Sequence, residues 1–279
     1  MVEWTWDIYT KEIIMKIFVL GSTGMVGRYV TKYLKGSIGV TREQVNALVT
    51  RADRFRHQFQ LLGVSSGDVV INLIGITNKQ NFDSWMFTQV NSLFPRLLAD
   101  YCEEIGAKMI HISTDCVFSG SEGYYTELSI PDDRSIYGIS KAAGEPKNCT
   151  VIRTSVVGEN KDNSKDLLEW VRNNPNDIIE GWTTHLWNGI TCLQFAKVCE
   201  YIISKDKFWS GVKHIYSPFP VSKAKLISLI IEVYDLKKEV RLVSTGRECN
   251  RTLSSTRSDF SIPIPPLKEQ LIEQKNFQW

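Results

Sequence analysis

The stretch that decides the fold is residues 17–34, which read IFVL, then GSTGMVG, then RYVTKYL. Residues 17–20 are apolar and stop at a glycine, as is typical of a buried parallel strand. Over residues 26–34 the apolar side chains recur at helical spacing. The connection between them carries three glycines at GxxGxxG spacing: Gly21, Gly24 and Gly27. Glycine permits a tight turn, and the N–H groups at a helix start attract phosphate, so this order predicts a dinucleotide pyrophosphate site.

The residues around this loop predict which dinucleotide it takes. We assign to the cofactor the loop itself, namely Gly21, Ser22, Thr23, Gly24, Met25, Val26 and Gly27. Residues 45–49 are the predicted second strand, followed by Thr50 and Arg51 where NAD-binding proteins often have an acidic residue. A guanidinium suits a 2′-phosphate, so NADP(H) is favoured and NAD(H) stays the alternative. The end of the third predicted strand adds Leu73, Ile74 and Gly75.

Strands and helices alternate along the first 160 residues. Strands are predicted at 68–74, 109–112 and 151–154, and a helix at about 91–105 with Pro95 near its first turn. This alternation predicts an α/β fold, a Rossmann-type doubly wound parallel sheet covered by helices on both faces. Further on the alternation weakens. The elements predicted there are helices at 163–174 and 222–234, a strand at 212–216, and a short helix after the proline-rich residues 262–266.

Composition excludes several classes of protein. The 279 residues include 33 Lys and Arg against 31 Asp and Glu, a net charge of +2, which argues against a nucleic-acid-binding protein. Four charged residues fall among the first twelve and no uncharged apolar run approaches about 20 residues, so neither a signal peptide nor a membrane span is predicted. The six cysteines form no CxxC pair and no histidine has metal-ligand spacing. Reduced thiols, a cytoplasmic location and no metal site are therefore expected.

Two short segments at predicted element ends carry groups for carbonyl chemistry. Tyr137 and Lys141 have YxxxK spacing, which puts them on one face of a helix. A phenol with a pKa of about 10 is a poor acid at neutral pH, and a nearby ammonium lowers that pKa toward the working range. Thr114 follows the strand at 109–112, and catalytic groups of doubly wound sheets collect at the carboxyl ends of strands. Its hydroxyl is expected to bond the carbonyl oxygen that Tyr137 protonates.

Together these motifs resemble those of the extended short-chain dehydrogenases/reductases, and specifically the dTDP-4-dehydrorhamnose reductase group. The resemblance covers about residues 16–260 and is most specific in STDxVFxG followed by YGxSKxxGE. The segments that carry it are GSTGMVG (21–27), DVVINLIG (68–75), Val90-Asn91, HISTDCVFSG (111–120), the Tyr125, Glu127 and Pro131 run, YGISKAAGE (137–145) and RTSVVGE (153–159).

The resemblance implies a domain division, a reaction and residue roles. It implies a Rossmann domain over 15–160 and, interleaved with it, a smaller nucleotide-sugar-binding domain over 161–279; residues 1–14 form an N-terminal extension, with Met15 as an alternative start. The implied reaction is NADPH-dependent reduction of the C4 ketone of a nucleotide-activated 4-keto-6-deoxyhexose, dTDP- or UDP-linked, with a 2-acetamido group as one option. Tyr137 would be the general acid, Lys141 would tune it and bond the nicotinamide ribose, and Thr114 would bond the reacting oxygen.

Cys116 departs from the family pattern, whose commonest form has tyrosine there. In the related GDP-fucose synthase group a cysteine at this place works with a histidine in C3/C5 epimerisation, and His185 lies where such a partner would be found. A bifunctional epimerase/reductase that uses Cys116 and His185 is therefore one alternative. The plainer alternative is a buried cysteine that fills the space of the missing tyrosine, with His185 in a pocket or structural position.

A further set of residues is assigned to the substrate: Thr114, Asp115, Cys116, Arg153, Trp182, Trp187, Asn188 and Arg251. The aromatic rings suit a sugar or a base, although a core patch would also explain them. The two arginines resemble positions near the family's diphosphate site, where a planar guanidinium matches phosphate oxygens, and a surface salt bridge is the alternative for each.

Two other classes of function remain open. A non-catalytic NADP-binding subunit, like the regulatory beta subunit of methionine adenosyltransferase, would share the fold but would not need the complete set of Thr114, Tyr137 and Lys141. A 4-epimerase or 4,6-dehydratase would use the same Tyr and Lys, but a dehydratase normally has an Asp-Glu pair where this chain has Asp115 and Cys116. The expected partner is a small-molecule nucleotide-sugar, with no nucleic acid and no membrane, and a homodimer is one option for the assembly.

Overall fold

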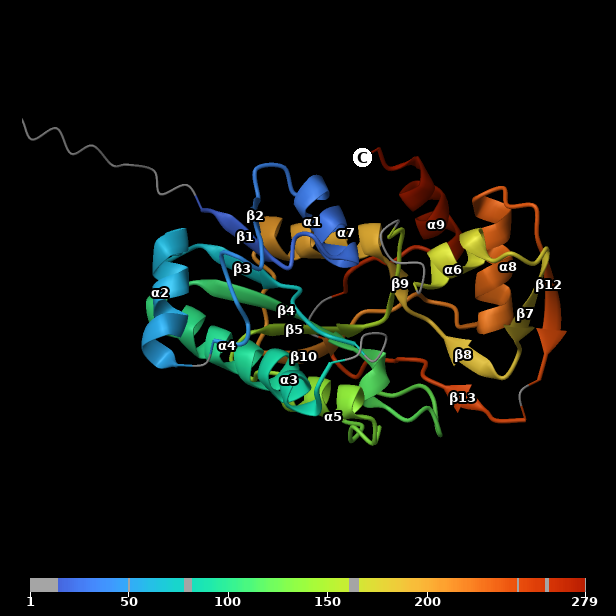
Figure 1. The fold of residues 1–279 in the computed structure, drawn as a ribbon, viewed down its shortest axis with the longest axis horizontal. Coiled ribbons are helices and arrows are strands. Elements are labelled where there is room, and N and C mark those ends of the chain that lie inside the picture. Colours follow the sequence, from blue (N-terminus) through green and yellow to red (C-terminus); the bar gives the residue numbers. More distant parts are fainter. Residues whose placement is uncertain are drawn as a thin grey trace, which may run out of the picture.

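A six-stranded parallel sheet forms the larger part of the molecule, in the order β2-β1-β3-β4-β5-β10 (Figure 1). The computed structural model describes residues 15–49, 51–77, 82–160, 166–244, 246–258 and 261–278, so the predicted N-terminal extension lies outside them. The strands of the sheet are β1 (Ile17–Leu20), β2 (Ile38–Val40), β3 (Val69–Asn72), β4 (Lys108–Thr114), β5 (Thr150–Thr154) and β10 (Gly211–His214). Because β2 and β3 flank β1 on opposite sides, the strand order reverses at β1, where doubly wound sheets bind ligands.

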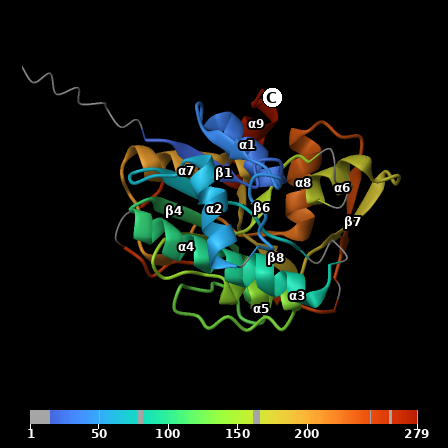
Figure 2. The ribbon, with the colours of Figure 1, turned by 60° about the vertical axis from the view of Figure 1, so that its left-hand side comes forward.

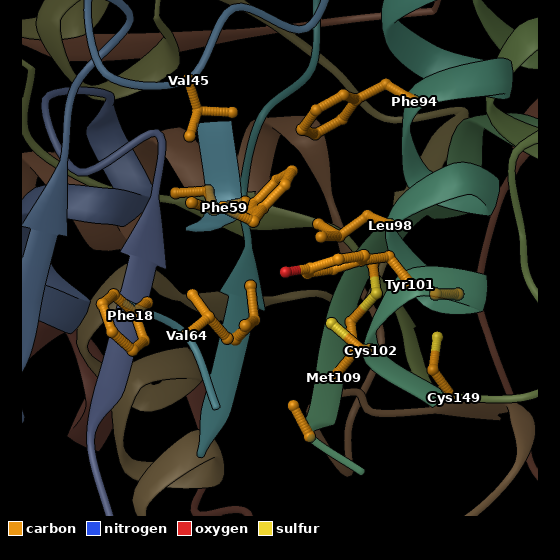
Figure 3. Close-up of a cluster of buried hydrophobic side chains, with 14 of the residues drawn as sticks. Phe18, Val45, Phe59, Val64, Phe94, Leu98, Tyr101, Cys102, Met109 and Cys149 are labelled. Atoms are coloured by element: carbon orange, nitrogen blue, oxygen red, sulfur yellow. The ribbon is translucent and has the colours of Figure 1, made fainter. Parts of the chain in front are cut away.

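Helices cover both faces of this sheet (Figure 2). One face packs on α1 (Met25–Tyr33) and α7 (Cys192–Ser204), the other on α2 (Ala52–Leu62) and α4 (Phe94–Ile105). Successive side chains of β1 alternate between the faces: Phe18 joins the aromatic cluster beneath α2 and α4, and Val19 joins the aliphatic cluster beneath α1 and α7. Figure 3 shows the first cluster, to which α2 contributes Phe59 and α4 contributes Phe94. The predicted doubly wound α/β fold is confirmed.

The rest of the chain builds a smaller part beside the carboxyl ends of the strands. Its helices are α6 (Leu167–Asn173), α8 (Lys223–Val233) and α9 (Leu267–Asn276). Its short strands are β6 (Val156–Val157), β7 (Ile178–Trp182), β8 (His185–Trp187), β9 (Ile190–Thr191), β11 (Val221–Ser222), β12 (Glu239–Val243) and β13 (Cys249–Asn250). Although β10 and α7 follow residue 160, they belong to the large sheet and its cover. In the described ranges every helix is too short or too polar to span a bilayer.

The prediction of a second strand at residues 45–49 is wrong. The second strand is β2, and residues 45–49 form turns in which the N–H of Val45 donates to the carbonyl of Thr41 (3.0 Å) and that of Val49 to Asn46 (3.1 Å). Val45 and Ala47 are apolar because they fill the core beneath α2, and not because they alternate along a strand.

The helix predicted at 91–105 is part of a longer and irregular element. It starts with α3 (Ser84–Phe87), continues as a π-helical turn over Thr88–Leu93 and becomes regular in α4. Pro95 lies in the first turn of α4, as predicted. Proline has no N–H, so Pro95 cannot donate to the carbonyl of Asn91 four residues earlier, and the irregular turn falls at this break.

Candidate active site

The glycine loop joins β1 to α1 and is shaped for an anion. Gly21 has a φ of +76°, a left-handed conformation that favours glycine. A Cβ on Gly27 would lie 2.1 Å from the carbonyl oxygen of Gly21, so glycine is required for α1 to pack this closely. Among the described residues no side chain caps α1, and its first turn holds no acidic residue. Its N–H groups are therefore free to bind a phosphate.

A cavity of about 240 Å³ lies beside this loop, between the segments that follow β1, β2 and β3. Of the predicted cofactor residues, it is lined by Gly21, Thr23, Gly24, Leu73, Ile74 and Gly75. Others in that set support the loop instead: Ser22 Oγ donates to the carbonyl of Val40 (3.1 Å), and Val26 packs on the core. Met25 lines a neighbouring cavity. A cavity at three strand ends beside an anion-binding loop fits a dinucleotide.

The cavity also identifies Arg42, which the sequence analysis missed. Arg42 follows β2 and lines the cavity, about 20 residues beyond the glycine loop, where dinucleotide-binding folds contact the adenosine ribose. Arg51, predicted for this role, immediately precedes α2 and pairs with Asp53 at 2.7 Å, with both side chains exposed. It is not among the residues that line the cavity, and Thr50 lies outside the described residues. The error follows from the misplaced second strand.

Thr114, Tyr137 and Lys141 come together at the carboxyl end of β4. Thr114 is the last residue of β4, and the other two lie one turn apart on α5 (Ile136–Ala143). A Cβ on Gly138 would lie 2.6 Å from the carbonyl oxygen of Cys116, so a glycine here lets α5 approach the turn after Thr114. The Thr114 hydroxyl lies close enough to the phenol of Tyr137 to lower its pKa.

Burial sets the charge states of this cluster. Lys141 is 4% exposed, and its Nζ donates to the carbonyl of Ile112 at 2.8 Å. Burial lowers its pKa to about 8, against an upward effect of Glu145, so at pH 7 it remains mostly a cation. The prediction that Lys141 lowers the pKa of Tyr137 is not confirmed: burial raises that pKa against the effect of Thr114, so the phenol keeps its proton, and Lys141 is not among the main causes of the shift. A protonated phenol beside a hydroxyl can give a proton to a carbonyl oxygen, and the Lys141 cation lies one helical turn further along α5.

The π-helical turn places Asn91 between the cofactor cavity and α5. Asn91 is fully buried; its Oδ1 accepts from the N–H of Ile76 and its Nδ2 donates to the carbonyl of Ile76, both at 2.9 Å. Its Nδ2 also donates to Ser140 Oγ on α5 at 3.1 Å. Ile76 lines the cofactor cavity, so one side chain ties that wall to the catalytic helix. Asn91 belongs to a segment that carries the family resemblance but has no site role predicted from the sequence, although π-helical turns often mark functional sites.

Asp115, Cys116 and Arg251 form a cluster beside Thr114. Asp115 Oδ1 accepts from Thr114 Oγ1 at 3.3 Å and from Cys116 Sγ at 3.4 Å. Arg251 donates to Cys116 Sγ at 3.4 Å and to Asp133 at 3.0 Å. Burial, reinforced by the Asp115 carboxylate, raises the pKa of Cys116 to about 12, so the thiol keeps its proton at neutral pH. The contacts described for this thiol do not include His185.

Two residues predicted to bind substrate are parts of the core, which corrects those predictions. Arg153 is 3% exposed, and all three nitrogens of its guanidinium are bonded: two to Glu145, at 2.9 and 2.6 Å, and one to His214 at 2.9 Å. The Asn188 amide donates to the carbonyl of Leu253 and accepts from its N–H, both at 2.8 Å. Both side chains hold the chain around the site instead of facing a ligand.

The two predicted tryptophans differ in environment. Trp187 of β8 is 4% exposed and packs in the core of the smaller part. Trp182 of β7 is 44% exposed, and its ring lies against His185, with centroids 4.6 Å apart. His185 lines a separate polar cavity with Arg251. Among the described residues no group of three or more His, Cys, Asp or Glu is placed to hold a metal ion.

Known proteins resemble this chain in sequence and fold. It is 32% identical to dTDP-4-dehydrorhamnose reductase of Mycolicibacterium smegmatis over 162 residues, 53% of this chain and 48% of that protein. It is 31% identical to spore coat polysaccharide biosynthesis protein SpsK of Bacillus subtilis over 158 residues, 51% and 53% of the two. The chain thus spans about half the length of the curated relatives it matches.

The likeness in fold extends further than the likeness in sequence. The structure of dTDP-4-dehydrorhamnose reductase from Bacillus anthracis in complex with NADP superposes with a TM-score of 0.78 at 17% identity, over 94% of this chain and 98% of that one. A family model for the RmlD substrate binding domain matches residues 15–178, more than half of the chain. That segment contains the glycine loop, Thr114, Tyr137 and Lys141. The predicted resemblance is therefore confirmed, and the chain belongs to the RmlD substrate binding domain family.

Proposed function

We propose that this protein is an NADPH-dependent oxidoreductase that reduces the C4 ketone of a nucleotide-activated 4-keto-6-deoxy sugar to a hydroxyl. The observation that carries the proposal is the cluster of Thr114, Tyr137 and Lys141 at the end of β4, tied by Asn91 to the cavity at the glycine loop. The similarity to dTDP-4-dehydrorhamnose reductase supports the choice of substrate class.

The residues around the glycine loop fit NADP(H). The backbone of Gly21 and Gly24 and the first turn of α1 would hold the pyrophosphate, because this turn has no competing side-chain cap among the described residues. Arg42 would bond the 2′-phosphate and Lys141 the nicotinamide ribose. When bound, the cofactor supplies a hydride for the C4 carbon.

The chain's own residues supply the proton and hold the ketone. Tyr137 donates its phenolic proton to the C4 oxygen as that oxygen gains negative charge. The Thr114 hydroxyl, whose one proton goes to Asp115 Oδ1 in this structure, would turn to donate it to the same oxygen and so fix the position of that oxygen. The Lys141 ammonium stabilises the phenolate that Tyr137 becomes, and its bond to Ile112 keeps it in place.

The direct test mixes the purified protein with NADPH and 4-keto-6-deoxyhexoses linked to dTDP, UDP or GDP. We expect loss of NADPH absorbance with at least one of them and a product with a hydroxyl at C4. No NADPH oxidation with any of the three would contradict the proposal.

The other readings of the sequence stay predictions. Nothing described at the Cys116 thiol favours epimerisation, because the thiol holds its proton and contacts Asp115 and Arg251. Turnover in deuterated water tests this reading, since C3/C5 epimerisation would leave deuterium at those carbons. A regulatory subunit would bind NADP without turnover in the same assay. The domain division at about residue 160, the homodimer and the cytoplasmic location are likewise untested.

A further inference from the structure

Two cavities meet at Lys223, away from the cofactor pocket. The smaller, of about 190 Å³, lies between Met25 of the glycine loop, residues 155–158 and Trp187. The larger, of about 490 Å³, lies between α6, β7 and α8, which Figure 1 shows gathered at one end of the molecule. Lys223 and Leu167 line both cavities. The two spaces therefore share a boundary at Lys223 and Leu167, and the smaller one reaches Met25 of the glycine loop.

The charge of Lys223 reaches the catalytic turn. Its Nζ lies 5.6 Å from the centroid of the Trp187 ring. Burial raises the pKa of Asp115, and the Arg251 and Lys223 cations oppose that shift. Desolvation and the same Lys223 cation lower the pKa of His185. A cation at the boundary of the two cavities, within electrostatic range of the residue next to Thr114, is suited to an anionic group joined to the sugar.

The first turn of α8 adds to this positive charge. Lys223 is the first residue of α8, which follows the cap Ser222, and no acidic residue lies in that turn. A cation at a helix N-terminus faces the positive end of the helix dipole, so helix stability does not account for it. A Cβ on Gly181 would lie 2.7 Å from Ala224, so glycine at 181 brings this turn directly against β7.

Aromatic side chains wall the larger cavity. Trp170 of α6 and Trp182 of β7 line it and are 40% and 44% exposed. Ile178, Ile179 and Ile227 complete a mostly apolar surface, and the Glu180–Arg241 ion pair lies at its edge. Exposed indole faces on two walls suit a planar heterocycle, because stacking removes them from water.

The competing space is the polar cavity of about 430 Å³ lined by His185, Arg247 and Arg251. Arg251 is bonded to Asp133 and Cys116 there, and Arg247 is exposed. That lining includes no Trp, Phe or Tyr in the described ranges. It can take an anion, but it lacks the flat apolar walls that a base requires.

We infer that Lys223 binds the diphosphate of the nucleotide-sugar and that the cavity between Trp170 and Trp182 takes the base, an assignment that rests on the proposed function for the sugar end. The substrate then lies with its ketone at Thr114, its diphosphate at the start of α8 and its base between α6 and β7. Lys223 is thereby a substrate-binding residue, and the cavity between Trp170 and Trp182 determines which nucleotide is accepted.

The test measures binding of dTDP, UDP and GDP by titration calorimetry, without sugar or NADPH. We expect Lys223→Ala to weaken the tightest-binding of the three at least tenfold and Lys223→Arg to restore most of the affinity. Trp182→Ala should also weaken it, with quenching of tryptophan fluorescence on binding lost in part. Lys225→Ala is the matched control, since Lys225 lies in the same turn of α8, is exposed and lines neither cavity; it should bind within twofold of the wild type.

Several outcomes would overturn the inference. One is that Lys223→Ala binds the nucleotide as tightly as the wild type. Another is that Arg247→Ala loses nucleotide affinity and Lys223→Ala does not. A third is that the wild type binds none of the three nucleotides. Failure of the proposed function is distinguishable from these. If Lys223→Ala loses nucleotide binding and the wild type reduces no sugar, the proposed function fails but the inference about Lys223 holds. If the wild type reduces a sugar and Lys223→Ala still binds nucleotide, the inference fails and the proposed function holds.

Discussion

Tyr137 carries the proton that the proposed reaction consumes. Tyr137→Phe keeps the ring and removes the hydroxyl, so we expect kcat to fall by about 10²–10⁴-fold, the usual contribution of a general acid, with NADPH affinity unchanged. Steady-state kinetics and a cofactor titration measure the two. Tyr124→Phe is the matched control, because Tyr124 is 60% exposed on a loop, and it should behave as the wild type. A kcat within tenfold of the wild type for Tyr137→Phe would show that another group donates the proton.

Arg42 decides the choice of cofactor in this account. Because a guanidinium bonds the 2′-phosphate that NADH lacks, Arg42→Ala should raise KM for NADPH at least tenfold and leave KM for NADH unchanged. Arg51→Ala should change neither, since Arg51 pairs with Asp53 outside the cavity. The reverse pattern, with the loss in Arg51→Ala, would restore the assignment made from the sequence.

Single residues were predictable where a motif fixes their place. Thr114, Tyr137 and Lys141 follow from spacing, because strand ends and one helix face bring them together. Arg153 and Arg251 look alike in the sequence, yet Arg153 is a buried ion pair with Glu145, whereas Arg251 pairs with Asp133 and also lines a cavity. A single sequence does not distinguish an arginine that pairs with a carboxylate of the protein from one that binds a ligand.

Asn91 links two elements, and its loss should affect both. Asn91→Ala removes three buried hydrogen bonds, so we expect the free energy of unfolding to fall by about 1–3 kcal/mol and NADPH affinity to fall with kcat. Urea unfolding and a cofactor titration measure these effects. Ser92→Ala is the control: Ser92 Oγ donates only to the Ser140 carbonyl on α5, at 2.8 Å, so this variant should keep its NADPH affinity. Equal NADPH affinity in Asn91→Ala and the wild type would refute the link.

Elements were predictable where local pattern and tertiary environment agree. β1, α1 and β4 follow from apolar runs and helical spacing that match their burial. β2 was missed because Ile38–Val40 is only three residues long, whereas Val45 and Ala47 imitate a strand by filling the core. The π-helical turn depends on the one hydrogen bond that Pro95 cannot make. The spacing of apolar residues along the sequence does not reveal such a missing bond.

A buried polar network around His214 joins segments that are far apart in the sequence. Its Nδ1 faces the carbonyls of Tyr125 and Ser254, at 3.1 and 2.8 Å, so the proton is assigned to Nδ1, and Nε2 accepts from Arg153. Glu145 bonds Arg153 on the other side. The network therefore joins β5, β10, the end of α5 and the segment near residue 254, and protonation of Nε2 would break it.

This network makes stability depend on acid pH. Burial and the Arg153 cation lower the pKa of His214 to about 4, whereas in the unfolded chain it is about 6.5. Between these values the unfolded chain binds a proton that the folded one does not, so stability falls as pH falls through the window, by up to about 3 kcal/mol. Burial of His111 lowers its pKa as well and acts in the same direction.

Urea unfolding from pH 7.5 to 4.5 tests the sign. His214→Asn keeps a donor near Nδ1 and should be less stable at pH 7.5 but lose less stability toward pH 4.5 than the wild type. His57→Asn, on the exposed side of α2, should keep the wild-type slope. Parallel slopes in the wild type and His214→Asn would remove His214 from the account.

The central claim is hydride transfer to C4 of a nucleotide-linked sugar. The most direct measurement gives the protein NADPH that carries deuterium at both C4 positions of the nicotinamide, with the 4-keto-6-deoxy sugar nucleotide that it turns over, and locates the label by NMR. We predict one deuterium at C4 of the sugar, none elsewhere, and labelled product that forms from Tyr137→Phe at least about a hundredfold more slowly. A product without deuterium at C4, or with deuterium at another carbon, would contradict it.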